Sequence, residues 1–347
     1  MYGWYCDVIK SLKLLAIRHG RLRSEENPRI LHFQLDHFFM RQQNAELFDL
    51  ASVIDWLKSQ DYRVTRPFTP RTFYCDDSPP ATLLKAAILD TETTGINSAT
   101  DKVIELGIVI VEYCPDTGQV YRVLETYNEL EDPGIPIPSE SIKIHHITDD
   151  MVRDKKISDA VVETLMTDVS LIIAHNATFD RGVVEARFPF FQEKAWACSF
   201  AQIPWKTEGF GSAGLEFLAY RCGFHFNGHR ASIDCHALLE VLQYALPVSG
   251  IKGLKVLVDK AAGLPDLKLW ALNTPFDSKE KLKVRGYRWH VERRTWHKTI
   301  SNEMLEDEID WLRAEVYDNR SFKLEHEKID AYNRFSIRSG ETEKVDY

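Results

Sequence analysis

Two acidic residues, Asp90 and Glu92, stand at the end of a short apolar run in the segment AAILDTETTG. Because side chains alternate across a β-strand, both carboxylates are expected to project from the same face at the end of that strand. Two carboxylates this close repel each other, and a bound cation would remove that cost. Taken alone, the pair is explained more simply as two solvated residues that open a loop.

Two later segments carry acids at similar junctions. LIIAHNATFDRGVVEARF passes from an apolar run to a helical pattern and places Asp180 near the change, and GHRASIDCHALLEVL places His229 five residues before Asp234. By itself, each acid is explained as a residue that a helix start stabilises, and the histidine as a surface residue or a cap. The conjunction favours a site, because four carboxylates and one histidine fall at element ends within about 150 residues.

This set of side chains suits displacement at phosphorus. Two divalent cations held by carboxylate oxygens stabilise both the attacking and the leaving oxygen of an in-line displacement. A histidine that titrates near neutrality can take the proton from the attacking water. The sequence therefore predicts a metal-dependent hydrolytic site.

The hydrophobic pattern predicts the elements that position these residues. Three strands joined by tight turns open the region, and a fourth buried strand follows among helices. We expect an α/β fold, with a mixed sheet and helices packed on it. The predicted strands are 83–90, 102–113, 119–130 and 170–176, and the predicted helices are 159–169, 178–188, 212–221 and 231–245, with a loop at 131–140.

Composition is that of an ordinary globular protein with room for roughly two to three domains. Of 347 residues, 44% are hydrophobic and 27% charged, and no apolar run approaches the ~20 residues of a membrane span. The six cysteines lie far apart without a CxxC pair, as expected for reduced thiols. The start has lysines inside its short apolar patch, so we expect no secretory signal, no membrane association and a cytoplasmic location.

The net charge of −9 lies in the middle of the chain. Residues 86–250 carry 12 basic and 24 acidic residues, whereas the flanks are close to balance. A polyanionic partner would normally be met by lysine and arginine. With cations bound among the acids, however, the pocket would attract phosphate.

The motifs DTETTG, AHNATFD and GHRASIDC resemble, in this order, those of the DEDD exonucleases, in the branch whose last motif carries histidine. That branch includes the proofreading subunit of the bacterial replicative polymerase and ribonuclease T. The resemblance spans roughly residues 84–246. It implies a ribonuclease H-like fold and stepwise 3′-to-5′ hydrolysis that releases nucleoside 5′-monophosphates.

The resemblance assigns a role to each site residue. Asp90 would bridge two divalent cations, Mg²⁺ with Mn²⁺ as a substitute. Glu92 and Asp234 would complete the first metal site, Asp180 would hold the second, and His229 would be the general base. Further positions implied to face or support the substrate are Thr93, Gly95, Ile96, Asn176 and His145. His146 departs from the family pattern, since glycine is common at that position.

The resemblance and the composition divide the chain into four parts. Residues 1–80 form a helical N-terminal extension of unknown role, which could bind a protein partner. Residues 84–248 form the exonuclease domain, residues 265–319 a small basic and aromatic module, and residues 320–347 a flexible charged tail.

The small module has two explanations. Cations that follow phosphates beside rings that stack on bases form a single-strand groove, but tryptophans can equally be the core of a short domain. KEKLKVRGYRW is similar to a module that trails the exonuclease domain in some bacterial members, and we expect it to feed the strand to the site. Between Pro275 and Ile300, three acids accompany Tyr287, Trp289 and Trp296 and eight cations, namely Lys279, Lys281, Lys283, Arg285, Arg288, Arg293, Arg294 and Lys298.

These observations predict a metal-dependent 3′-to-5′ exonuclease whose partner is nucleic acid, DNA rather than RNA. One alternative is a ribonuclease that trims RNA 3′ ends, because no motif detects a 2′-hydroxyl. The other is a non-catalytic nucleic-acid-binding protein on the same fold. A missing carboxylate would have favoured that second alternative, but all five site residues are present.

Overall fold

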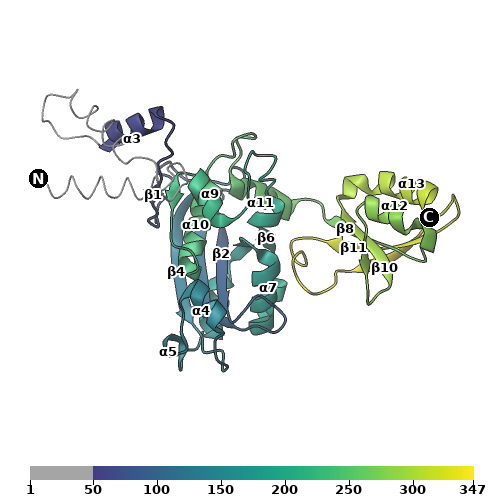
Figure 1. Cartoon of the computed structure of the whole chain (residues 1–347), viewed down its shortest axis with the longest axis horizontal. Coiled ribbons are helices and arrows are strands. Elements are labelled where there is room, and N and C mark those ends of the chain that lie inside the picture. The colour runs from purple at the N-terminus through teal and green to yellow at the C-terminus, as the bar shows by residue number, and fades with distance from the viewer. Residues whose placement is uncertain (1–49) are drawn as a thin grey trace, which may run out of the picture. The chain divides into compact units, whose positions relative to one another are not determined.

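The computed structural model describes residues 50–347 (Figure 1). The chain divides into two units, Met1–Val64 and Thr65–Tyr347. In the first unit, the described residues contain the helix α3 (Leu50–Ser59). Most of the helical extension predicted at residues 1–80 lies outside the described residues. The predicted binding of a protein partner to it lies outside them as well. Residues 60–80 contain no helix, because their prolines favour extended chain.

The second unit is built on a mixed five-stranded sheet with the order β4-β3-β2-β5-β6. The pairs β2–β3 and β3–β4 are antiparallel, whereas β2–β5 and β5–β6 are parallel. This arrangement confirms the predicted ribonuclease H-like α/β class. The strands are β2 (Leu84–Thr93), β3 (Val103–Tyr113), β4 (Val120–Leu130), β5 (Val169–Ala174) and β6 (Trp196–Cys198), of which β6 was not predicted.

Strand β2 is buried on both faces, which explains why its sequence is an apolar run rather than an alternation. Ala86 and Ile88 belong to one hydrophobic cluster with α10, and Ala87 and Leu89 to another with α7 (Figure 1). The predicted helices correspond to α6, α7, α9 and α10 within a few residues. The helices of this region are α4 (Ser139–His145), α5 (Asp149–Val152), α6 (Asp159–Met166), α7 (Ala177–Arg187), η1 (Pro189–Glu193), α8 (Ser199–Gln202), α9 (Leu215–Arg221), α10 (Ala231–Gln243) and α11 (Gly253–Ala262).

Segments on both sides of the predicted domain pack on its core. Leu254 and Leu257 of α11 are fully buried in the same cluster as α10, so the packed region extends beyond the predicted end at 248. On the other side, β1 (Arg66–Pro67) pairs in parallel with β7 (Phe224–His225). Buried Glu240 of α10 binds Arg66 at 2.8 Å and Arg71 at 2.7 Å.

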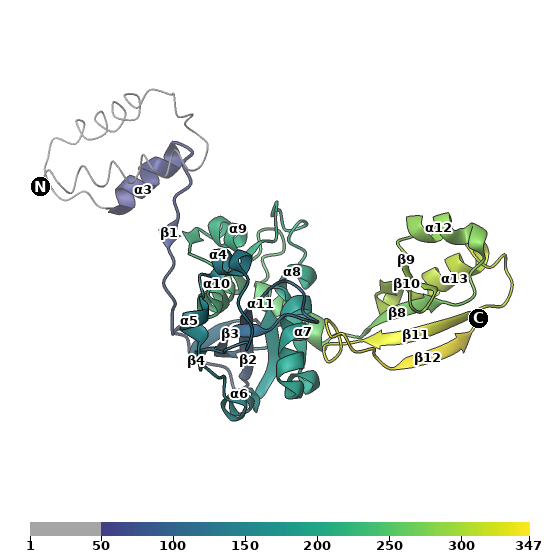
Figure 2. The same ribbon diagram turned by 60° about the horizontal axis from the view of Figure 1, so that its bottom comes forward.

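The C-terminal region forms a second sheet with the order β12-β11-β8-β10-β9 (Figure 2). Residues 320–347 are therefore not a flexible tail, since β11 pairs with β8 along its length. Buried Phe322 and Leu324 anchor β11 in the core of this module. Its elements are β8 (Asp266–Ala271), η2 (Phe276–Ser278), α12 (Lys279–Val284), β9 (Arg288–His290), β10 (Thr295–Ile300), η3 (Asn302–Met304), α13 (Leu305–Glu315), β11 (Lys323–Ile329) and β12 (Thr342–Asp346).

Within the described part of the chain, no helix combines the length and the apolar character that a membrane crossing requires. The cytoplasmic location stays a prediction.

Candidate active site

The five residues predicted to carry the chemistry line one pocket of about 610 Å³. Asp90 and Glu92 come from β2, Asp180 from the first turn of α7, and His229 and Asp234 from the loop before α10 and its first turn. Carboxylate oxygens of Asp90, Glu92 and Asp234 lie within 4.8 Å of one another. Three segments far apart in the sequence thus meet at the end of β2.

A glycine on β3 allows α10 to approach the sheet. Gly107 is the register partner of Asp90, and a Cβ atom built there would lie 2.5 Å from the carbonyl carbon of Ala231. No side chain fits this gap without moving the backbone. Gly107 therefore lets the start of α10 lie directly against β3, which brings Asp234 to Asp90.

Glu105, which the sequence analysis did not single out, holds the loop before α10. Its fully buried carboxylate binds Arg230 Nη2 at 2.7 Å and accepts hydrogen bonds from Asn128 Nδ2 at 2.9 Å and the Ala231 N–H at 3.0 Å. Burial raises the pKa of Glu105, but these hydrogen bonds and the Arg230 charge outweigh it and lower the pKa below the usual value. Its position inside the apolar run VIELG was the available signal.

Asp180 is held by hydrogen bonds at the start of α7. Its side chain is 3% exposed and accepts a hydrogen bond from Thr91 Oγ1 at 2.9 Å. The backbone carbonyl of Asn176 accepts the N–H groups of Phe179 at 2.8 Å and Asp180 at 3.2 Å. Asn176 therefore organises this turn through its backbone, while its exposed side chain lines the pocket.

The carboxylates of the pocket resist ionisation in the protein alone. Burial, followed by repulsion from neighbouring acids, raises the pKa of Glu92 to about 8 and that of Asp90 well above its ordinary value. Burial also raises the pKa of Asp180 to about 7 and of Asp234 to about 6. Among the described residues, none of the four forms an ion pair with lysine or arginine. This uncompensated set of oxygen donors fits divalent cations.

Two histidines line the pocket, and their environments differ. His229 is exposed, and its φ of +67° places it in the left-handed region, held between Gly228 and the anchored Arg230. His175 directly precedes Asn176, and its Nδ1 lies 2.7 Å from Ser199 Oγ. Burial lowers the pKa of His175 to about 4, so it is neutral at physiological pH. Its place inside AHNATFD is the signal that could have identified it.

The remaining predicted substrate positions lie outside the lining of this pocket. Thr93 donates its hydroxyl to the Gly95 carbonyl at 2.5 Å, and Ile96 is 93% exposed at the tip of the following turn. His145 is buried, with Nδ1 accepting the Ile147 N–H at 3.0 Å. The next residue, His146, ends α4 with a φ of +60°, which explains why glycine suits this position.

Comparison with known proteins agrees with this geometry. Residues 87–242 match the RNase T exonuclease family model, so they form an exonuclease domain. The DNA polymerase III PolC-type of Lacticaseibacillus paracasei is 33% identical over 119 residues, which cover 34% of this chain and 8% of that protein. The DNA polymerase III subunit epsilon of Buchnera aphidicola subsp. Acyrthosiphon pisum is 32% identical over 127 residues, which cover 34% of this chain and 51% of that protein.

Among solved structures, Exonuclease X in complex with 5′ overhanging duplex DNA is 25% identical, with a TM-score of 0.35. That match covers 45% of this chain and 88% of the other. The chain spans about half of the Buchnera subunit and less than a tenth of the PolC-type polymerase that it matches.

Proposed function

We propose that this chain is a metal-dependent 3′-to-5′ exonuclease that hydrolyses single-stranded or frayed DNA to nucleoside 5′-monophosphates. One observation carries the proposal: four carboxylates, which have no cationic partner in the described part of the chain, share a pocket of an exonuclease domain with one exposed imidazole. Chemistry at phosphorus needs both groups, the acids as cation ligands and the imidazole as a base.

The ligands for the cations come from three elements. Asp90, Glu92 and Asp234 offer the oxygens for one divalent cation, Mg²⁺ or its substitute Mn²⁺, and Asp180 lies beside them for a second. Cations bound there would stabilise negative charge on the phosphodiester oxygens. Thr91 Oγ1 orients Asp180, and the Arg230 N–H orients Asp234 Oδ2 at 3.0 Å. These hydrogen bonds prepare both carboxylates for ligation.

His229 is the proposed general base. The oxygen of a water molecule bonds to phosphorus, while the bond from phosphorus to the 3′ oxygen of the preceding nucleotide breaks. His229 accepts the water proton at an imidazole nitrogen, and the departing 3′ oxygen takes a proton from solvent water to become the 3′ hydroxyl of the shortened strand. The other histidine of the pocket, His175, is a poor base because burial lowers its pKa to about 4.

The relatives favour DNA as the substrate and partner. Both polymerase relatives are named as DNA polymerase III proteins, and each is similar to about a third of this chain. Trimming of RNA 3′ ends is the alternative, since the pocket residues act on the phosphodiester that DNA and RNA share.

Digestion of end-labelled oligonucleotides tests this proposal. With Mg²⁺ or Mn²⁺, we expect a 5′-labelled DNA strand to shorten one nucleotide at a time, and a chelator to stop the reaction. Immediate release of labelled mononucleotide would show the opposite polarity, and internal fragments would show an endonuclease. Parallel digestion of single-stranded DNA, duplex DNA and RNA identifies the preferred substrate. Faster hydrolysis of RNA would show that RNA, and not DNA, is the substrate.

A further inference from the structure

The C-terminal module uses most of its cations and rings internally. Tyr287 and Trp296 are buried in its core. Five of the eight cations between Pro275 and Ile300 are paired with acids of the same module. These pairs are Lys281–Glu315, Lys283–Glu280, Arg285–Glu308, Arg293–Glu325 and Lys298–Glu308. A continuous basic groove over the whole segment is therefore absent from the described module.

One pocket of about 560 Å³ combines exposed rings with unpaired cations. Phe276 is 78% exposed and Trp289 is 48% exposed, and both rings line it. Lys279 and Arg294 also line it, and neither has an acidic partner among residues 50–347. The Lys279 ammonium lies 4.4 Å from the centre of the Phe276 ring, which keeps this cation at the pocket.

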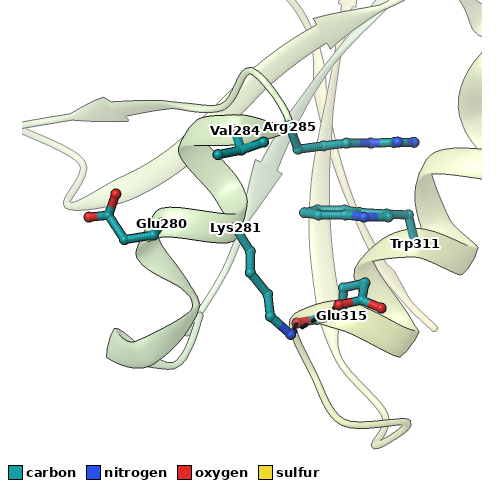
Figure 3. A pocket seen from close by; sticks show the side chains of 6 residues that line it. All are labelled: Glu280, Lys281, Val284, Arg285, Trp311 and Glu315. Atoms are coloured by element: carbon teal, nitrogen blue, oxygen red, sulfur yellow. Dashed lines mark hydrogen bonds and ion pairs between the residues drawn. The ribbon is translucent and has the colours of Figure 1, made fainter.

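A second crevice of the same module, lined by Arg285 and Trp311, has a covered ring and paired cations. Figure 3 shows Arg285 stacked on the indole of Trp311 and Lys281 extended to Glu315. Arg285 also binds Glu308 at 3.2 Å. The ring of this crevice is covered and its cations are neutralised, so it offers a polyanion neither a stacking surface nor free charge.

We propose that the pocket of Phe276, Trp289, Lys279 and Arg294 binds one nucleotide of a single-stranded DNA, as a substrate-holding site apart from the catalytic pocket. An exposed indole stacks with any base, and free cations bind the flanking phosphates. The pocket volume lies within the range of small-ligand sites. The inference rests on the proposed function, because it takes a nucleic acid as the ligand.

The occupant must combine a flat ring with negative charge. An acidic peptide would use the two cations but would leave the rings exposed to water. A nucleotide satisfies both features at once, because its base and its phosphate are joined through one sugar. Charge and aromatic surface together therefore favour a nucleic-acid strand over an acidic polypeptide.

Binding without hydrolysis tests the site. We use the full chain in a chelating buffer and measure the anisotropy of a 5′-fluorescein oligothymidine. Trp289→Ala should weaken binding about tenfold, and Trp289→Phe should restore most of it, because a stacking ring remains. Lys279→Gln with Arg294→Gln should lower the slope of log Kd against log salt by about 0.7 for each phosphate that the protein no longer neutralises.

Lys283→Gln is the matched control. It removes one exposed cation from the same helix, but Lys283 is already paired with Glu280 and does not line the pocket. Its Kd should stay within twofold of the parent chain. The melting temperature of every variant is measured as well, to check that each variant folds.

The outcomes separate this site from the active site. Equal binding by Trp289→Ala and the parent chain would overturn the inference, even if DNA is hydrolysed. Displacement of the oligonucleotide by polyglutamate at equal charge concentration would also overturn it. Binding that depends on Trp289, in a chain that hydrolyses no nucleic acid, would support the site and refute the exonuclease proposal instead.

Discussion

At the scale of single residues, the pocket separates two tasks. The acids are buried or half-buried and have raised pKa values, which suits groups that hold cations. His229 is exposed on a strained backbone, which suits a group that meets water and substrate. Substitution of an acid should therefore change cation binding, whereas substitution of His229 should change the rate of hydrolysis.

Replacing His229 by alanine tests this separation. His229→Ala should lower the single-turnover rate by about 10²- to 10⁴-fold, because it removes the general base. Manganese affinity, measured by titration calorimetry, should stay unchanged, because every carboxylate remains. His225→Ala, at an exposed histidine of β7, is the control and should keep full activity. Full activity of His229→Ala between pH 6 and 9 would refute the assignment.

The sequence analysis singled out five residues that line one pocket, because each of their motifs is local. The residues that support them were not predictable in this way. Glu105 binds Arg230, 125 positions away along the chain, and Gly107 matters only because Ala231 packs on it. These contacts exist only after β3 and α10 have come together, so no local pattern records them.

At the scale of elements, α7 joins the two sheets of the second unit. Arg181, the residue after Asp180, is fully buried and binds Glu185 at 2.6 Å. It also donates to the carbonyl of Arg334 at 2.8 Å and to those of Ala331 and Tyr332. The segment between β11 and β12 therefore satisfies a buried charge on the helix that carries Asp180.

Loss of this guanidinium should destabilise the fold. Arg181→Ala should lower the free energy of unfolding by about 3–5 kcal/mol, because Glu185 and three carbonyls lose their buried donor. Arg153→Ala is the control, since Arg153 forms an exposed pair with Asp150, and it should cost less than about 1 kcal/mol. Urea unfolding followed by circular dichroism measures both. A change of under about 1 kcal/mol in Arg181→Ala would contradict the proposed anchor.

Strand β11 shows why the prediction of a flexible tail at residues 320–347 was wrong. Their sequence is charged and low in apolar content, which is typical of a flexible tail. In the structure, buried Glu325 binds Arg293 at 2.5 Å, and buried Glu327 accepts the Trp270 Nε1–H at 2.9 Å. Partners from β8 and from the turn between β9 and β10 satisfy these acids, and a sequence pattern counts the acids but not their partners.

At the scale of the whole second unit, flanking segments complete the exonuclease domain. Deleting residues 251–347 would remove Leu254 and Leu257 from its core and leave Arg181 without its carbonyl acceptors. Such a deletion would report loss of folding rather than loss of DNA binding. Point variants in the exposed pocket of the C-terminal module are the cleaner test of its role.

The acidic pocket should make stability depend on pH and on cations together. The pKa values of Glu92, Asp180 and Asp234 are raised to about 8, 7 and 6, so the folded protein holds protons that the unfolded chain has already released. Without metal, the free energy of unfolding should therefore fall as the pH rises from about 4 to about 8. Cation ligation needs the deprotonated carboxylates, so Mn²⁺ should stabilise most at pH 8 and little at pH 5.

At a free Mn²⁺ concentration of about 100 times Kd, the stabilisation is about 2.7 kcal/mol, or roughly 4–5 °C in Tm at pH 8. Asp90→Asn should raise the metal-free Tm at pH 8, because a neutral amide avoids the cost of placing a carboxyl group that resists ionisation among other acids. It should also abolish the response to Mn²⁺. Thermal unfolding with and without Mn²⁺ at pH 5 and pH 8 measures both effects. An equal response at the two pH values, or a response that survives in Asp90→Asn, would mean that Mn²⁺ binds elsewhere than among these carboxylates.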